Sequence, residues 1–128
     1  MTSLRGLKVL LLEDDYLISA ATADLLKEEF GCDVTAVFDL DQAEQALNKE
    51  SPQIGVLDVN IFGQLSFPIA DLLHERHIPI VFVTGYDVPS LGGRWKEFPV
   101  CRKPCAADQL KQNLIAALSR TAASGEQP

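Results

Sequence analysis

The sequence lacks the features that mark membrane and nucleic-acid-binding proteins. None of its apolar runs approaches the roughly 20 residues that a membrane-spanning helix needs, and its start has neither the apolar stretch nor the cleavage site of a secretion signal. Its 11 Lys and Arg residues are scattered and its net charge is −7, which disfavours the phosphate neutralisation behind non-specific nucleic-acid binding. We therefore expect a cytoplasmic protein with neither a membrane nor a nucleic acid as partner.

Cysteine is also scarce, and its spacing disfavours a zinc site. The three cysteines, Cys32, Cys101 and Cys105, form no CxxC pair, and no cysteine or histidine cluster accompanies them. An odd number of cysteines in a chain without an export signal favours reduced thiols. We therefore expect these residues to have structural roles as free thiols.

What the sequence does contain is a regular alternation of buried strands and amphipathic helices. Its 128 residues, 47% of them hydrophobic, suit one domain over 1–128, with a core over about 7–122 and a frayed tail over 123–128. Apolar runs without polar alternation are typical of strands buried on both faces. Such a chain favours a parallel α/β sheet. The predicted strands are 7–13, 34–38, 54–58, 78–84 and 100–102, and the predicted helices are 16–30, 40–47, 67–76 and 106–122.

The segment 85–99 breaks this alternation. Pro89, Gly92 and Gly93 lie in its middle, where a regular helix would lose roughly 1 kcal/mol for each glycine and about 3 kcal/mol for the proline. The sequence therefore predicts that the fourth helix of the series is irregular or missing, with at most one short turn in its place.

Polar residues end four of the predicted strands. Glu13 and Asp14, Asp58, Thr84 and Lys103 each stand at or just after the end of an apolar run. The carboxyl ends of parallel strands share one edge, where ligands bind in the crevice of the sheet. These side chains would then meet, and they suit Mg²⁺-assisted phosphoryl transfer to an aspartate, with Asp58 as the nucleophile.

The acids of this group predict a magnesium site. Mg²⁺ prefers oxygen ligands and usually takes only one or two carboxylates from the protein, keeping several waters. We expect Asp14 as a direct ligand, Glu13 through a water, Asp58 itself and the backbone carbonyl of Asn60. The metal would offset the repulsion between an anionic nucleophile and an anionic donor.

The remaining members predict a phosphoryl-binding site. The hydroxyl of Thr84 can donate to a phosphoryl oxygen, and Gly85 leaves room for the group to enter. Lys103 supplies a point charge that suits a phosphate oxygen or the carboxylate of Asp58. We assign Asp58, Thr84 and Lys103 to the chemistry, and Thr84, Gly85 and Lys103 to phosphoryl binding.

These motifs together resemble the signature of the response-regulator receiver domains, which are CheY-like. The resemblance implies a (βα)5 flavodoxin-like fold, Mg²⁺ as cofactor, and a phosphoryl group passed to Asp58 from a sensor histidine kinase or a histidine phosphotransfer protein of a bacterial two-component system. It also implies signalling by protein–protein contact without an output domain, no conventional enzyme activity, and a monomer or a weak phosphorylation-dependent dimer. The matching segments are 11–15, 56–60, 83–85 and 102–104.

A narrower resemblance and two departures concern the signalling surface. Segment 79–86 is similar to the "FATGUY" subgroup of single-domain receivers, with Tyr86 directly after the glycine. Most receivers carry an aromatic three residues before the lysine, where this chain has Val100, and another after Lys-Pro, where it has Cys105. We therefore predict a switch through 85–98, with Tyr86 and Trp95 as candidate interface or reporter residues.

Two alternatives remain open from the residues alone. A phosphatase of the haloacid-dehalogenase type also uses a strand-end aspartate, a threonine, a lysine and Mg²⁺, but it needs a second acid two residues after the nucleophile, where this chain has Asn60. A pseudo-receiver would bind partners without phosphorylation. The complete set of acids, threonine and lysine argues against it, and Val100 argues for it.

Overall fold

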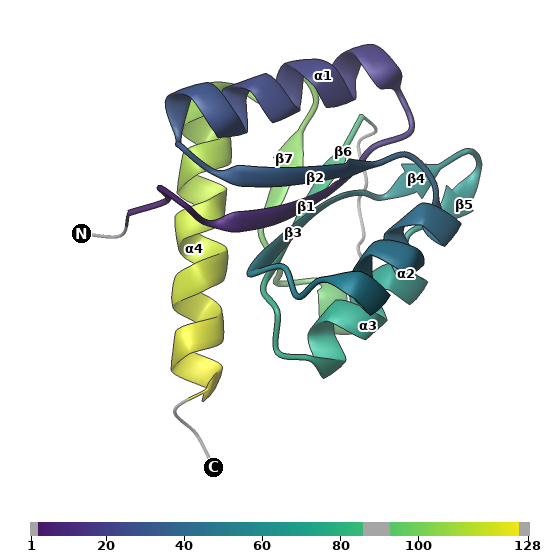
Figure 1. Ribbon diagram of the computed structural model, residues 1–128. Coiled ribbons are helices and arrows are strands. Elements are labelled where there is room, and N and C mark those ends of the chain that lie inside the picture. The colour runs from purple at the N-terminus through teal and green to yellow at the C-terminus, as the bar shows by residue number, and fades with distance from the viewer. Residues whose placement is uncertain (1–2, 86–92, 126–128) are drawn as a thin grey trace.

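The computed structural model describes residues 3–85 and 93–125, and they form one five-stranded parallel sheet with helices on both faces. The strand order is β2-β1-β3-β6-β7 (Figure 1). This is the strand order of the flavodoxin-like fold, which the resemblance to receiver domains implies. The strands are β1 (Lys8–Leu12), β2 (Asp33–Val37), β3 (Ile54–Asp58), β6 (Ile80–Thr84) and β7 (Val100–Arg102). The helices are α1 (Tyr16–Asp24), η1 (Leu25–Glu29), α2 (Leu40–Lys49), α3 (Phe67–Glu75), η2 (Gly93–Trp95) and α4 (Ala107–Gly125).

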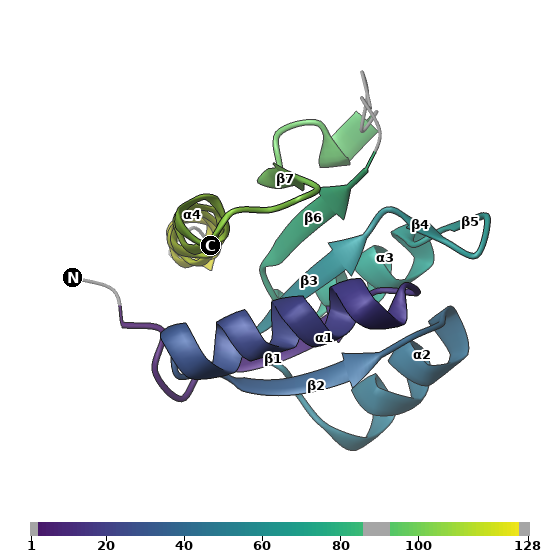
Figure 2. The ribbon, with the colours of Figure 1, turned by 90° about the horizontal axis from the view of Figure 1, so that it is seen from above.

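The chain reverses its direction of winding between β1 and β3, which are neighbours at the centre of the sheet. Leu12 pairs with Leu57 across these two strands, and Asp58 pairs with Val83 on the other side of β3. Viewed from above, α1 and α4 lie on one face of the sheet and α2 and α3 on the other (Figure 2). Such a switch point leaves a crevice at the carboxyl ends of the strands.

Successive strand residues enter different halves of the core because side chains alternate across a sheet. Leu11 packs in the cluster that includes α1 and α4, whereas Leu10 and Leu12 pack in the cluster that includes α2 and α3. The three central strands, β1, β3 and β6, are therefore buried on both faces, which explains why their sequences show continuous rather than alternating apolarity.

The predicted helices form, with two differences at their ends. The first is an α-helix over Tyr16–Asp24 that continues as a π-helical turn over Leu25–Glu29, and Gly31 follows in the left-handed region with φ of +73°. The last helix runs to Gly125. The predicted frayed tail over 123–128 is therefore wrong for residues 123–125, because helical hydrogen bonding continues past the last core positions.

The segment after β6 has no regular fourth helix in its described part. Only the three-residue 3-10 helix η2 forms there, as predicted. Trp95 is buried in the core. The centroid of its ring lies 5.6 Å from that of Phe82 and 5.1 Å from that of Phe98. Trp95, a candidate interface or reporter residue, is thus a core residue, because its large apolar surface fills the layer beside α3. Tyr86 lies outside the described residues.

A short hairpin follows β3, between the predicted strand 54–58 and the predicted helix 67–76. Strands β4 (Asn60–Ile61) and β5 (Gln64–Leu65) pair antiparallel. Their two connecting residues, Phe62 and Gly63, have φ of +50° and +81°. Positive φ at both positions is what a tight two-residue hairpin turn requires, and glycine adopts it without strain.

The expectation of reduced thiols is wrong for two of the three cysteines. Cys101 at the middle of β7 and Cys105 before α4 form a disulfide, with Cα atoms 5.8 Å apart. The chain bends through Lys103 and Pro104, which brings the two cysteines to the usual separation for such a bond. Cys32 is a free, buried thiol, and burial raises its pKa.

Over residues 3–85 and 93–125, no helix is both long enough and apolar enough to span a membrane.

Candidate functional site

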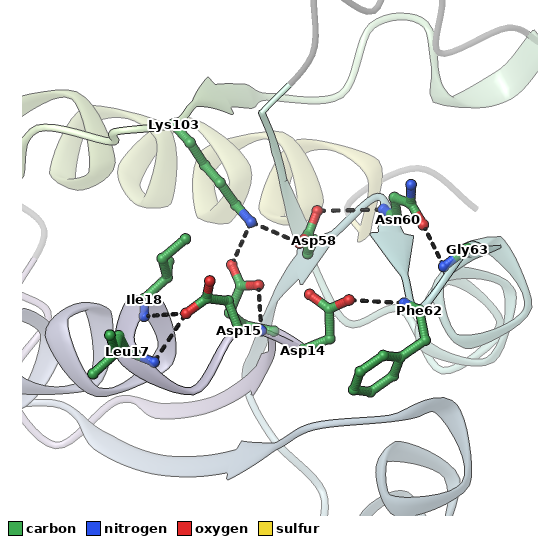
Figure 3. A network of polar contacts seen from close by, with 10 residues as sticks. Asp14, Asp15, Leu17, Ile18, Asp58, Asn60, Phe62, Gly63 and Lys103 are labelled. Carbon is green, nitrogen blue, oxygen red and sulfur yellow. Dashed lines mark hydrogen bonds and ion pairs between the residues drawn. The ribbon is translucent and has the colours of Figure 1, made fainter.

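The polar residues that the sequence placed at strand ends meet at the carboxyl edge of the sheet, and Figure 3 shows Asp14, Asp58 and Lys103 among them. Glu13 follows β1, Asp58 ends β3 and Thr84 ends β6. Their exposed fractions are 3%, 6% and 3%. Three polar side chains with so little exposure would be costly in an ordinary core, so their concentration at one edge marks it as a site.

Lys103 connects the two buried acids. It follows β7, and its side chain reaches across the edge toward Asp58 (Figure 3). Its Nζ lies 2.7 Å from Asp58 Oδ2 and 2.7 Å from Glu13 Oε1. The backbone N–H of Lys103 donates to the carbonyl of Thr84 at 2.9 Å, which ties the lysine to the end of β6. The ammonium is therefore held against both carboxylates by strand geometry as well as by charge.

Two pKa values reflect the burial of charged groups at this edge. Burial raises the pKa of Glu13 to about 7; the hydrogen bonds from Lys103 and from the Asp15 amide oppose this, while neighbouring Asp58 adds to it. Burial alone would lower the pKa of Lys103, but its hydrogen bonds and charge attraction to Asp58 and Glu13 outweigh that effect and raise it. The lysine is therefore charged, whereas burial favours the neutral form of Glu13.

Asp14 is oriented by the hairpin that the sequence did not predict. The backbone N–H of Phe62 donates to Asp14 Oδ2 at 2.7 Å, across 48 positions of the chain. The φ of +50° at Phe62 belongs to a region that non-glycine residues rarely adopt. This strained backbone aims an amide at the acidic site, which is the kind of place where proteins keep such strain. The spacing of Asn60 and Gly63 was the available signal for the turn.

Asn60 supports the same arrangement from the base of the hairpin. Its backbone N–H donates to Asp58 Oδ1 at 3.3 Å, and its side-chain oxygen accepts from the Gly63 N–H at 2.9 Å. Both hydrogen bonds fix the backbone that carries the predicted carbonyl ligand. The role of that carbonyl stays a prediction.

Asp15 serves the first helix rather than the acidic cluster. Its Oδ1 accepts from the N–H groups of Leu17 at 2.9 Å and Ile18 at 3.0 Å, and it is the N-cap of α1. Its own N–H donates to Glu13 Oε2 at 3.0 Å. Of the three consecutive acids, Glu13 is therefore buried, Asp14 faces the hairpin and Asp15 caps the helix.

The chemistry of the donor set fits Mg²⁺. Glu13, Asp14 and Asp58 each offer a carboxylate oxygen, and these oxygens all lie within 4.8 Å of one another. Hard oxygen donors gathered at this spacing are what a small divalent cation prefers. Burial is the main cause of the raised pKa of Glu13, and the neighbouring Asp58 charge adds to it, so a bound cation would favour the ionised carboxylate. A cation is the simplest counter-charge for such a cluster.

Not every predicted functional residue belongs to this assembly. Thr84 and Gly85 lie at it, and a Cβ on Gly85 would make only an ordinary contact with Lys103 Cδ at 3.8 Å, so there is space on that side of the crevice. Trp95 packs instead with the core beside α3, and Val100 packs against the same cluster from β7. Sequence reasoning missed Phe62, whose contribution is a backbone amide that no side-chain pattern reveals.

Among the comparisons with known proteins, the solved structures give matches, and they include receiver domains. No family model and no curated protein matches the sequence. Among solved structures, SdrG from Sphingomonas melonis Fr1 is 32% identical, with a TM-score of 0.77 over 92% of this chain and 99% of that chain. The signal receiver domain of a modulated diguanylate cyclase from Desulfovibrio desulfuricans G20 is 27% identical, with a TM-score of 0.79 over 93% and 98%. The REC domain of the PhyR response regulator from Erythrobacter litoralis is 27% identical, with a TM-score of 0.78 over 89% and 91%.

Proposed function

Because this chain belongs to the response-regulator receiver domains, we propose that it accepts a phosphoryl group on Asp58. The donor is a sensor histidine kinase or a histidine phosphotransfer protein, and the phosphorylated domain acts by binding a downstream protein. Its own chemistry is limited to its phosphorylation and the hydrolysis of the product, so it is not a conventional enzyme. We place it in the cytoplasm, as a monomer or a weak phosphorylation-dependent dimer.

One observation carries this proposal: Lys103 Nζ lies 2.7 Å from oxygens of both Asp58 and Glu13, at the edge where Thr84 also ends its strand. A structural salt bridge needs one acid, whereas this ammonium joins two that are almost fully buried. A buried excess of negative charge is expensive to fold. The presence of two buried acids at the edge of the crevice nevertheless favours a role in binding cations and transferred anionic groups.

The proposed step is a displacement at phosphorus. An oxygen of Asp58 attacks, a new P–O bond forms, and the bond from phosphorus to the donor histidine nitrogen breaks, with its electron pair staying on the nitrogen. Lys103 and the Thr84 hydroxyl would bind phosphoryl oxygens, and Gly85 leaves space for them. Glu13, Asp14, Asp58 and the Asn60 carbonyl would hold Mg²⁺, which supplies positive charge against the repulsion between the reactants.

The test is the intact mass of the protein after incubation with acetyl phosphate, with and without Mg²⁺. We expect one phosphoryl adduct that depends on Mg²⁺ in the wild type and none in Asp58→Asn, with unchanged circular dichroism. Asp39→Asn, at the half-buried N-cap of α2, is the matched control and should still be phosphorylated, because asparagine also caps helices well. A folded wild type without an adduct, also after incubation with histidine kinases, would favour a pseudo-receiver, the reading to which Val100 points.

A further inference from the structure

A second feature of the crevice is an apolar groove that opens beside Lys103. It lies between α1 and the start of α4 and has a volume of about 700 Å³. Val83 and Leu110 are its buried lining residues. Leu17 and Ile18 of α1 line one side, and Pro104 lines the other. This volume is within the roughly 300–1,000 Å³ that is typical of small-molecule sites, which are likewise mainly apolar with a few polar groups.

Exposed apolar residues border this groove. Leu17 has an exposed fraction of 81%, and Ile18 is also exposed. Their backbone amides are held by the Asp15 carboxylate, so their positions are fixed although their side chains lack cover. Large apolar side chains held in this way beside a reactive site favour an apolar ligand over simple solvent exposure.

The groove and the proposed phosphoryl site share one residue. Lys103 lines the groove and contacts Asp58, and Gly85 lines the groove without a side chain to close it. With Mg²⁺ bound at the acids as proposed above, a ligand here would meet the ammonium of Lys103 and the metal at one end and apolar walls along the other. That polarity matches a molecule with an anionic phosphoryl head and a neutral apolar body.

We propose that this groove receives the acyl group of small acyl phosphates, so that the protein prefers donors with propionyl or butyryl groups over acetyl phosphate. The inference rests on the proposed function of Asp58. The attacking oxygen of Asp58 forms a P–O bond, the bond from phosphorus to the acyl oxygen breaks, and the departing carboxylate keeps the electron pair. No proton, oxidant or further reactant is needed for the balance.

The same groove would also favour release of the product. The acyl group is neutral while it is joined to phosphate, but it leaves as a carboxylate with a full negative charge. An apolar lining disfavours an isolated charge strongly, and the net charge of the protein is −7. Binding is therefore selective for the donor over the spent acid.

The experiment measures kcat/KM for phosphorylation of Asp58 by acetyl, propionyl and butyryl phosphate with Mg²⁺. The three parent acids have nearly equal acidity, so the leaving groups are matched in reactivity. Each methylene that becomes buried should raise kcat/KM about fourfold, which makes butyryl phosphate on the order of tenfold better than acetyl phosphate. Binding of butylphosphonate and methylphosphonate, followed by NMR, should show the same order without any chemistry.

Three matched variants locate the effect. Leu17→Asn and Ile18→Asn should each flatten the dependence on chain length, whereas Leu65→Asn, at an exposed leucine of β5 outside the groove, should leave it unchanged. Circular dichroism establishes that each variant folds. A steep dependence that persists in both groove variants would overturn the assignment.

The outcomes separate the inference from the proposed function. If acetyl phosphate modifies Asp58 but the longer donors are no better, the groove assignment is wrong and the phosphorylation of Asp58 stands. If no donor modifies Asp58 in folded protein, the proposed small-donor chemistry itself is wrong. If the dependence is flat and Leu17→Asn abolishes phosphorylation by a histidine kinase instead, the groove belongs to a protein partner and the inference fails.

Discussion

The two walls of the crevice are built on different principles. The acidic wall, Glu13, Asp14 and Asp58, is fixed atom by atom through Lys103 and the amides of the hairpin. The apolar wall, formed by Leu17 and Ile18, has directional bonds only at its backbone, and its side chains border open space. The acidic wall constrains the charge and the position of a bound group, whereas the apolar wall constrains only the size and the polarity of a bound group.

If the proposed function and the proposed donor preference hold, this difference combines a chemistry shared by receiver domains and a preference particular to this chain in one site. Hydrogen bonds and ion pairs tolerate little change in distance, so the acidic wall is suited to a reaction with one geometry. Apolar contacts are roughly proportional to area and lack direction, so the opposite wall can vary in the ligand that it favours without disturbing the acids.

The largest effect is expected where the walls meet. Lys103→Ala removes the ammonium that pairs with both buried acids, and the rate of phosphorylation by acetyl phosphate should fall on the order of 10²-fold, as when a preorganised donor is lost elsewhere. Lys111→Ala, an exposed lysine of α4, removes the same charge and should keep the wild-type rate. Time courses of intact mass measure both. An unchanged rate in Lys103→Ala would remove the lysine from the chemistry.

A change confined to the acidic wall should be smaller. Asp14→Ala deletes one of the three gathered oxygens and the acceptor of the Phe62 amide, so Mg²⁺ affinity measured by calorimetry should weaken by about tenfold or more. Asp24→Ala, at an exposed acid of the same helix region, changes the net charge equally and serves as the control. Equal affinities in the two variants would show that Asp14 acts only through long-range charge.

The smallest effect is expected at the residue that positions the apolar wall. Asp15→Ala removes the N-cap of α1, which accepts from the amides of Leu17 and Ile18, and the free energy of unfolding in urea should fall by about 1 kcal/mol. Asp15→Asn keeps an accepting oxygen and should recover most of that loss. Mg²⁺ affinity in Asp15→Ala should match Asp24→Ala. A larger loss of affinity would make Asp15 part of the metal site.

The sequence was sufficient to predict the sheet and the polar residues at its carboxyl edge, because both follow from local patterns. Buried parallel strands have continuous apolar runs. Asp14, Asp58, Thr84 and Lys103 each stand at or just after the end of such a run, and the carboxyl ends of parallel strands share one edge. The short η2 followed from the cost of glycine and proline in a helix. The finer resemblance to one receiver subgroup stays a prediction.

What the sequence could not predict depends on contacts between distant residues or on backbone atoms. The Phe62 amide reaches Asp14 across 48 positions, and no side-chain pattern encodes it. The burial of Trp95 depends on the space beside α3, which only the assembled core defines. The Cys101–Cys105 bond depends on a bend at Lys103 that brings two Cα atoms to 5.8 Å. Spacing rules drawn from CxxC motifs do not cover that geometry.

The disulfide has a consequence for equilibrium measurements on this protein. Cys101 is anchored in the core and Cys105 borders the groove, so the bond closes a small ring with Lys103 at its centre. Binding at the acidic wall and reduction of this bond are then linked equilibria that share one residue. The factor by which reduction changes the affinity for Mg²⁺ must equal the factor by which Mg²⁺ changes the equilibrium constant for reduction. Thiol titration with and without Mg²⁺ therefore measures the coupling between metal binding and reduction of the disulfide independently of calorimetry.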